Sequence, residues 1–185
     1  MRKVLYILGH FDDHDVEWLA RAGVRRRIAA GQRLITEGTP IASLFVVLEG
    51  HVAVTVRGVG TVARLSAGEV VGEMSFVDSA PPSASVEALE GCVVLELSRA
   101  DLSAKLAADP GFTGRFYKAM ALFLADRLRN TVRRLGYGED TSLADEGVLA
   151  DELDDAILDS LSQAGDRFDR LLRTLATARL VDSHG

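Results

Sequence analysis

The residues with the clearest chemical potential lie between Gly72 and Val86, in the stretch GEMSFVDSAPPSASV. A short helical turn that opens near Glu73 and Met74 would direct unpaired backbone N–H groups, and the positive end of its dipole, at an anion. Gly72 has no side chain, so it lets the backbone come close to a bound group. The serines that follow add hydroxyl donors. The stretch therefore predicts a seat for a small anion.

This stretch resembles the phosphate-binding cassette of the cyclic nucleotide-binding domain, the β-roll module shared by the catabolite activator protein and the regulatory subunit of protein kinase A. The family pattern runs Gly-Glu, a short helical turn, then Pro-Arg-Ser/Thr-Ala-Ser/Thr-Val. Pro82 stands where the family has the arginine that grips the phosphate. The residues that match are Gly72, Glu73, Pro81, Ser83, Ala84, Ser85 and Val86.

The resemblance assigns roles within the cassette. It implies that Glu73 accepts a hydrogen bond from the ribose 2′-OH, which a carboxylate does strongly. It also implies that Ser83 and Ser85 donate to the exocyclic phosphate oxygens. From the cassette and from the far end of the long helix that follows, we expect the ligand-binding residues to be Val71, Gly72, Glu73, Met74, Ser75, Pro81, Pro82, Ser83, Ala84, Ser85, Arg64, Asn130 and Thr131.

Pro82 weakens the expected grip on a phosphate, because it offers neither charge nor N–H and restricts Pro81 to extended geometry. Loss of a bidentate charge-assisted contact in a buried site costs about 2–5 kcal/mol, or roughly a 30- to several-thousand-fold loss of affinity. Arg64 and Arg57, on neighbouring strands, are the candidate substitutes. The alternative is a β-roll that keeps its turn residues but has lost its ligand.

Short β-branched runs punctuated by glycine predict an antiparallel β-roll or jelly roll, so the fold class is α+β and mainly β. We expect a two-residue hairpin at Glu49-Gly50 and a turn at Gly58-Val59-Gly60. Gly31, Gly38, Gly50 and Gly68 also fall where the family's glycines fall. The predicted strands are Arg33–Thr36, Leu44–Leu48, His51–Arg57, Thr61–Leu65, Ser85–Ala88 and Cys92–Leu97.

Helices are expected on both sides of the roll. Asp12 and Asp15 predict a capped helix over Asp13–Ala22, with Gly23 as its terminator. A long helix from about Phe112 to Leu135 carries apolar residues at spacings of three and four. In the family this helix pairs with its twin, so we expect a homodimer through Phe116, Met120, Phe123, Leu124 and Leu128.

The remaining chain is an acidic tail. Residues 139–185 hold 12 acidic residues against four arginines, which argues against contact with nucleic acid. Only 47 residues follow Gly138, too few for the winged helix-turn-helix of the related transcription factors. Arg167, Arg170 and Arg173 alternate with acids and are interpreted as a solvated face. Two apolar patterns predict helices that pack on the roll, on a second chain or on another protein: Val148, Leu149, Leu153, Ile157, Leu158 and Leu161, ended by Gly165, then Phe168, Leu171, Leu172, Leu175 and Leu180.

Other classes of protein find little support. His10 and His14 have an HxxxH spacing but straddle the start of a helix, so a metal site is not expected. No standard catalytic motif is present, and the chain is predicted not to be an enzyme. The single Cys92 lies in an apolar strand and is expected to be a buried thiol. The lack of a long apolar run or a signal peptide favours a cytoplasmic protein.

Two functions remain open. The first is a non-catalytic sensor that binds a cyclic nucleotide such as cAMP or cGMP, rearranges its long helix and signals to a protein partner through the tail. The second is an interaction module that keeps the roll for its shape. The chain also resembles stand-alone bacterial proteins that show Pro-Pro-Ser in place of Pro-Arg-Ser. The domain plan is residues 1–110 for the roll with its first helix, 111–136 for the dimerisation helix and 137–185 for the tail.

Overall fold

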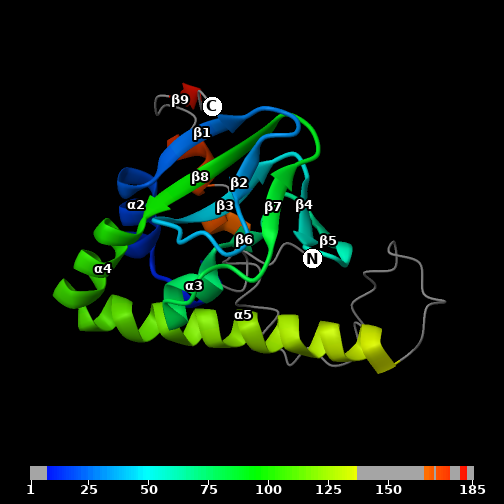
Figure 1. Ribbon diagram of the computed structural model, residues 1–185. Helices are drawn as coiled ribbons and strands as arrows, with labels where there is room; N and C mark the ends of the chain where they lie inside the picture. The colour runs from blue at the N-terminus through cyan, green and yellow to red at the C-terminus, as the bar shows by residue number, and fades with distance from the viewer. Residues whose placement is uncertain (1–7, 137–164, 169, 176–179, 183–185) are drawn as a thin grey trace.

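Two β-sheets face each other, with helices α2, α4 and α5 around them (Figure 1). The computed structural model describes residues 8–136, 165–168, 170–175 and 180–182. One sheet has the strand order β6-β3-β8-β1-β9, and the other has the order β2-β7-β4-β5. The strands are β1 Val24–Ile28, β2 Arg33–Ile35, β3 Ser43–Glu49, β4 Val52–Val56, β5 Gly60–Leu65, β6 Val70–Val71, β7 Ser85–Ala88, β8 Cys92–Ser98 and β9 Leu180–Asp182.

The space between the two sheets is filled by β-branched and aliphatic side chains. Alternate residues of a strand point to opposite faces, so each strand sends one set of side chains inward. The Cys92 thiol lies in this core, as the sequence predicts, and burial raises its pKa above the ordinary value. The buried residues of this cluster are Ile28, Ile35, Val47, Val52, Leu65, Val71, Val86, Ala88, Cys92 and Val94.

All six predicted strands are present, and the predicted antiparallel roll is confirmed. The sequence missed β1, whose three consecutive arginines hide any apolar alternation, and β6, which is only two residues long. The hairpin predicted at Glu49-Gly50 is wrong, because β3 and β4 belong to different sheets. Gly50, at φ +85°, is where the chain crosses from one sheet to the other.

Helix α2, Asp13–Ala22, begins and ends where the sequence predicts. Asp12 and Asp15 form the capping box: the Asp15 N–H donates to Asp12 Oδ1 at 3.0 Å, and the Asp12 N–H donates to Asp15 Oδ2 at 2.9 Å. Gly23 ends the helix in extended backbone. Glycine is required there because a Cβ would lie 2.4 Å from Leu95 Cδ1.

A second core lies between the β6-β3-β8 side of the first sheet and the helices. Helices α4, Arg99–Ala108, and α5, Pro110–Gly136, follow β8. Phe116, Met120 and Phe123 are all buried within this one chain. This corrects the prediction that the three side chains lie in a dimer interface. Leu124 is partly buried, whereas Leu128 is 64% exposed.

The C-terminal helical segment, residues 165–168 and 170–175, packs on this second core through Phe168, Leu171 and Leu175. The structure thus favours packing on the roll among the alternatives for this part of the tail. The first of the two predicted tail helices lies outside the described residues. Gly165 is helical and does not end a helix, and Leu180 belongs to β9, which pairs with β1.

The interpretation of the tail arginines as a solvated face is wrong for Arg167, whose side chain is only 19% exposed, whereas Arg170 is half exposed and also forms ion pairs. Arg170 Nη1 lies 2.9 Å from Asp13 Oδ2 and Arg170 Nη2 lies 3.4 Å from Glu17 Oε1, while Arg167 Nε lies 3.3 Å from Asp13 Oδ1. Two acidic side chains of α2 therefore bind the C-terminal helical segment. Arg173 is exposed.

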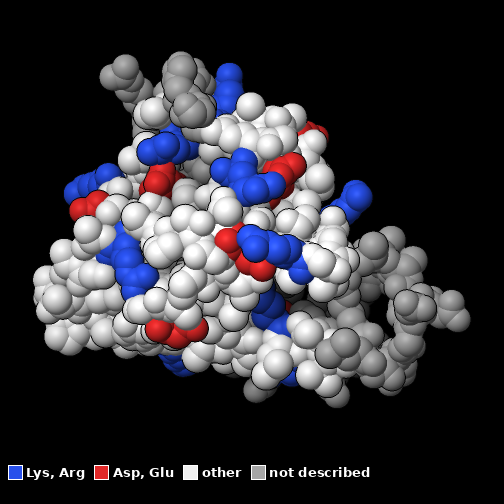
Figure 2. Space-filling model, viewed as in Figure 1, with Lys and Arg blue, Asp and Glu red and all other residues white. Residues whose placement is uncertain are grey.

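Charged side chains of both signs lie close together over the described part of the face in Figure 2, rather than forming one broad basic surface. Within the residues that the structure describes, no helix has the length and apolar character needed to cross a membrane.

Candidate functional site

The predicted cassette begins where β6 meets helix α3, Glu73–Asp78. Gly72 joins them with φ +90°, a conformation that side chains rarely adopt. A Cβ at this position would lie 2.9 Å from Ile41 Cδ1 and 3.1 Å from the Ser43 carbonyl oxygen. Glycine therefore serves here both for its backbone angle and for its small size.

Glu73 is the buried acid of the cassette, with its side chain 2% exposed. Its Oε1 is paired with Nη1 of Arg127, which comes from α5. Burial of a carboxylate without a partner is very unfavourable, so an arginine at this position stabilises it. The sequence analysis names Glu73 as a candidate binding residue but does not name Arg127 as its partner.

Arg127 makes further contacts around the start of the cassette. Its Nη2 donates to the Val70 carbonyl oxygen at 3.1 Å and lies 4.0 Å from Oε2 of Glu69, which is also buried. The centre of its guanidinium lies 4.8 Å from the centroid of the Phe123 ring, within the range of a cation–π contact. Arg127 thus joins α5 to the segment between Glu69 and Glu73.

A second arginine holds the opposite end of α3. Arg99 Nη1 donates to the Ser75 carbonyl oxygen at 2.9 Å, and its Nη2 donates to Ser79 Oγ at 2.8 Å. Carbonyl groups at a helix C-terminus lack partners within the helix, and a cation there is favourable. The short helix α3 is therefore fixed by Arg127 at its start and by Arg99 at its end.

The Pro-Pro-Ser part of the cassette is held mainly by backbone contacts with the turn after β2. The Gly38 N–H donates to the Pro82 carbonyl oxygen at 2.8 Å, and the Glu37 N–H donates to Ser85 Oγ at 3.0 Å. Glu37 in turn accepts from the Arg57 N–H at 2.8 Å. Ser85 is buried and Ser83 is exposed, so the two predicted hydroxyl donors have different surroundings.

The other predicted binding residues are spread over several environments. Val71 and Ser75 are buried, Ala84 and Pro82 are partly buried, and Pro81 and Met74 are exposed. The two candidate substitutes for the missing arginine, Arg64 and Arg57, are both exposed.

The two ligand-binding residues predicted at the far end of the long helix, Asn130 and Thr131, lie on the last turns of α5. Thr131 is exposed, and its hydroxyl donates to the Arg127 carbonyl oxygen at 2.9 Å. Asn130 belongs to α5, but its side chain lies outside what the structure describes.

Three residues that contact the cassette or its start, Arg127, Glu69 and Arg99, are not among the residues that the sequence predicts for the site. A signal for Arg127 was present, because the buried positions Phe116, Met120 and Phe123 continue at helical spacing to residue 127. An arginine on the buried stripe of a helix requires a carboxylate partner in the core. No comparable pattern in the sequence marks Glu69 or Arg99.

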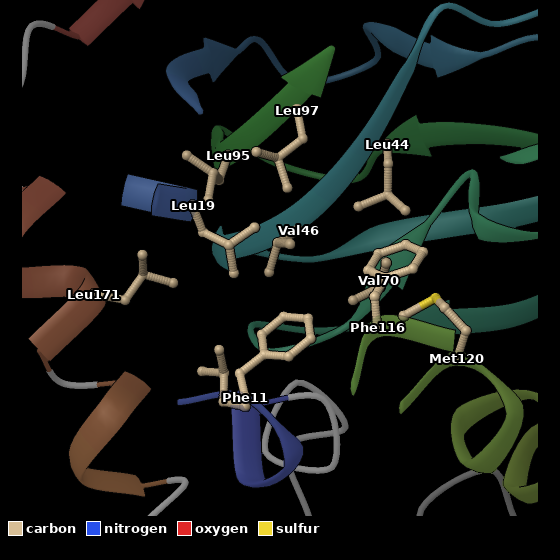
Figure 3. Close-up of a pocket in the computed structure, with 11 residues that line it drawn as sticks. Phe11, Leu19, Leu44, Val46, Val70, Leu95, Leu97, Phe116, Met120 and Leu171 are labelled. Carbon is tan, nitrogen blue, oxygen red and sulfur yellow. The ribbon is translucent and has the colours of Figure 1, made fainter. Parts of the chain in front are cut away.

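A small apolar cavity of about 30 Å³ lies in the core between the first sheet and the helices (Figure 3). Its lining includes Val70 of β6, Phe116 and Met120 of α5 and Leu171 of the C-terminal helical segment. None of the residues that line it belongs to the cassette, and the lining offers no polar group. The cavity is too small to hold a nucleotide.

The chain is similar to known proteins in sequence and in fold. The family model of the cyclic nucleotide-binding domain matches residues 25–109. An uncharacterized NTE family protein of Mycobacterium tuberculosis is 33% identical over 130 residues, which cover 69% of this chain and 22% of that protein. The Pycsar effector protein XpPycTIR of Xanthomonas perforans is 33% identical over 112 residues, or 60% of this chain and 37% of that protein. The chain thus spans between about a fifth and two fifths of these relatives.

Solved structures show the same fold. A cyclic nucleotide-binding domain from Methylobacillus flagellatus has a TM-score of 0.65 and 29% identity, and the match covers 75% of this chain and 85% of that one. The N-terminal domain of a transcriptional regulator from Streptomyces coelicolor has a TM-score of 0.58 and 27% identity, with 76% and 100% covered.

Proposed function

Because the family model of the cyclic nucleotide-binding domain matches residues 25–109, we propose that this chain is a non-catalytic regulatory module that binds a cyclic nucleotide at its cassette, residues 71–85. The observation that carries the proposal is the buried Glu73 carboxylate, which lies at the glycine turn of the cassette and is ion-paired with Arg127 of α5. A carboxylate in this position can accept a hydrogen bond from a ribose hydroxyl. Because it is paired with Arg127, a bound ligand would also change its contact with α5.

The pairing supplies a physical route from ligand to helix. A ligand hydroxyl that bonds to Glu73 changes the set of donors around that carboxylate, and therefore changes the stability of the contact with Arg127. Helix α5 shifts its equilibrium position only if the ligand binds the two arrangements differently. The effect is reciprocal, so a partner that holds α5 in one position also alters the affinity for the ligand.

Pro82 sets the expected affinity below that of a cassette with an arginine at this position. Restoring a charge-assisted contact with Pro82→Arg is expected to strengthen binding by about 1.5–3 kcal/mol, or roughly 10- to 150-fold. The Gly38 N–H donates its hydrogen bond to the backbone carbonyl oxygen of residue 82. The substitution retains this carbonyl group and therefore the hydrogen bond.

The test is calorimetry with a panel that includes cAMP and cGMP on the native protein, Glu73→Gln and Pro82→Arg. Glu87→Gln is the matched control, because Glu87 is a partly exposed acid on β7 that pairs with Arg33. We expect weak native binding, tighter binding by Pro82→Arg, a clear loss in Glu73→Gln and no change in the control. Absence of binding by both the native protein and Pro82→Arg at millimolar ligand would rule out the sensor.

The names of the relatives agree with a regulatory role. They include a cAMP-dependent protein kinase regulatory subunit of Candida albicans, 27% identical over 97 residues that cover 21% of that protein. Signalling to a protein partner, through α5 and the acidic tail of a homodimer, is part of our proposal for this chain.

A second function, an interaction module without a ligand, is favoured by one observation. Glu73 is already neutralised by an arginine of the same chain, and the cassette lacks its own cation at Pro82. A roll stabilised in this way holds its shape without a nucleotide. The calorimetric test separates the two functions.

A further inference from the structure

Arg127 contacts Glu73 directly through Nη1 and is the more exposed of the two, with its side chain 27% exposed against 2% for Glu73. A ligand hydroxyl that bonds to Glu73 therefore binds a carboxylate that already holds a guanidinium. This contact makes Arg127 part of any site built around Glu73, although no residue of the cassette pattern points to it.

The charges around Glu73 show why this position matters. Two buried carboxylates, Glu69 and Glu73, share contacts with Arg127. A cyclic phosphodiester would bring another negative charge into a site that is already rich in acid, and like charges at short range in a poorly solvated site repel strongly. Pro82 supplies no cation to offset that repulsion. An anionic ligand therefore needs a cation that reaches the site from another element.

The other arginines near the cassette are poorly placed for this role. Arg99 is bonded to carbonyl and hydroxyl oxygens at the far end of α3. Arg64 and Arg57 are exposed on or beside the second sheet. Arg127 is the arginine that the described contacts place at Glu73, and its ring contact with Phe123 holds the guanidinium over the start of the cassette.

We propose that Arg127 is the anion-binding residue of this site and takes the phosphate contact that Pro82 cannot make. This inference rests on the proposed function. The planar guanidinium carries five N–H donors and can serve two acceptors at once. Nη1 keeps its contact with Glu73, while Nη2 exchanges the neutral Val70 carbonyl oxygen for a charged phosphate oxygen. Such a charge-assisted bond is roughly twice as strong as the neutral one that it replaces.

Glu73 can take part in the same arrangement. A carboxylate has two oxygens with about four lone-pair sites, so it accommodates both an arginine and a ribose hydroxyl. The ligand is then gripped by one residue of the cassette and by one residue of α5. A nucleotide with a single anionic phosphodiester and a free 2′-hydroxyl fits this pair, whereas a neutral nucleoside does not use Arg127.

The experiment is a double-mutant cycle measured by calorimetry with cAMP, cGMP and the neutral nucleosides adenosine and guanosine. The four proteins are the native chain, Arg127→Gln, Pro82→Arg and the double variant, with Arg129→Gln as the exposed control on the same helix. We expect Arg127→Gln to weaken cyclic nucleotide binding about 10- to 150-fold, with little effect on nucleosides. The gain from Pro82→Arg is expected to be larger in the Arg127→Gln background, because a second cation adds less to the binding of one phosphate than the first.

Three outcomes would overturn the inference. Arg127→Gln could bind a cyclic nucleotide as tightly as the native protein or more tightly, which would make the arginine only a cover over Glu73. Pro82→Arg could give equal gains in both backgrounds, which would mean that the two positions act independently. Finally, Pro82→Arg could bind while the native protein does not, which would leave the proposed function of the roll intact and refute the role of Arg127.

Absence of binding by all four proteins would instead refute the proposed function itself. Since Arg127→Gln leaves a buried acid without its cation, it can fail to fold. Arg127→Lys then decides the question, because it keeps the charge but loses the planar fork. The inference predicts weaker cyclic nucleotide binding for this variant, with unchanged nucleoside binding, and unchanged binding of both would contradict it.

Discussion

Helix α5 is attached to the rest of the molecule by two arginine–carboxylate pairs that share a chemistry and differ in their surroundings. Near its start, Arg115 pairs with Asp15 of α2; three turns later, Arg127 pairs with Glu73 of the cassette. Asp15 and Glu73 are both almost completely buried. Twelve residues at 1.5 Å each separate the two arginines by about 18 Å along the helix. One helix thus carries two buried pairs, one with the capping box of α2 and one with the cassette.

The first pair, of Arg115 with Asp15, is bidentate. Arg115 donates to both oxygens of Asp15, through Nε at 2.6 Å and Nη2 at 2.9 Å, and this hydrogen bonding to Asp15 raises the pKa of Arg115 above its ordinary value. Asp15 also accepts from the Asp12 N–H in the capping box. Arg115 Nη2 also lies 3.1 Å from Asp12 Oδ2, so the acceptors of this pair are the two carboxylates of the capping box.

The Arg127 pair is divided between different acceptors. One nitrogen of the guanidinium contacts a carboxylate, while the other contacts the neutral carbonyl of Val70. A neutral acceptor is more readily replaced by a charged one than a carboxylate is. We therefore expect the two pairs to have different roles: Arg115 fixes the helix in place, and Arg127 changes its contacts when a ligand binds at the cassette.

The largest effect is expected from breaking the fixed pair. Asp15→Asn leaves Arg115 without its buried counter-ion, and removal of one partner of a buried pair costs about 3–5 kcal/mol. Urea denaturation should show this loss in the free energy of unfolding, with Asp101→Asn, an exposed acid in α4, as the control. A loss below about 1 kcal/mol would remove the distinction between the two pairs.

A second prediction concerns the outer face of α5, which carries the exposed residues Tyr117, Leu128 and Val132. If α5 pairs with its twin on this face, both arginine pairs stay on the inner face and respond within one chain. Leu128→Asp is expected to weaken the dimer by about 2 kcal/mol or more, because it places a charge in an apolar contact. Sedimentation that shows a native monomer at micromolar concentration would contradict the dimer.

The third prediction tests the geometry of the cassette. Gly72→Ala combines a strained backbone with a Cβ close to Ile41 and Ser43, and is expected to cost about 1–3 kcal/mol and to impair ligand binding. Gly31→Ala is the matched control, since Gly31 has φ +77° but no atom within 4 Å of the added Cβ. The difference between the two variants in thermal unfolding measures the clash alone. Equal losses would show that Gly72 is needed only for its backbone angle.

The smallest effect is expected at Asp109, a partly exposed residue at the start of α5. Asp109 caps the helix by accepting from the Phe112 N–H at 2.9 Å, and its hydrogen bond with Lys105 lowers its pKa below the ordinary value of 3.8. A carboxyl group whose pKa is lowered in the folded protein stabilises the fold at pH values above its ordinary pKa. This contribution is lost as the pH falls through the lowered pKa. The stability difference between native protein and Asp109→Asn should therefore vanish in acid. A difference that does not change with pH would exclude the ionised cap.

The sequence predicted local features better than contacts between distant elements. The capping box of α2, the strand β7 and the inward stripe of α5 follow from residue spacing, and each appears where expected. The pair of Arg127 with Glu73 joins residues 54 positions apart, and no periodic pattern specifies such a partner. The Glu49-Gly50 hairpin failed for a related reason, since a glycine turn does not reveal whether the two strands pair or belong to different sheets.

The most direct test of the account is hydrogen exchange along α5 with and without saturating cAMP or cGMP. We expect a ligand to change the protection of backbone amides near Arg127 and in residues 69–76, while amides around Arg115 and Asp15 keep theirs. A uniform change in amide protection along the whole helix, or a change confined to the Arg115 end, would contradict the different roles of the two arginine pairs.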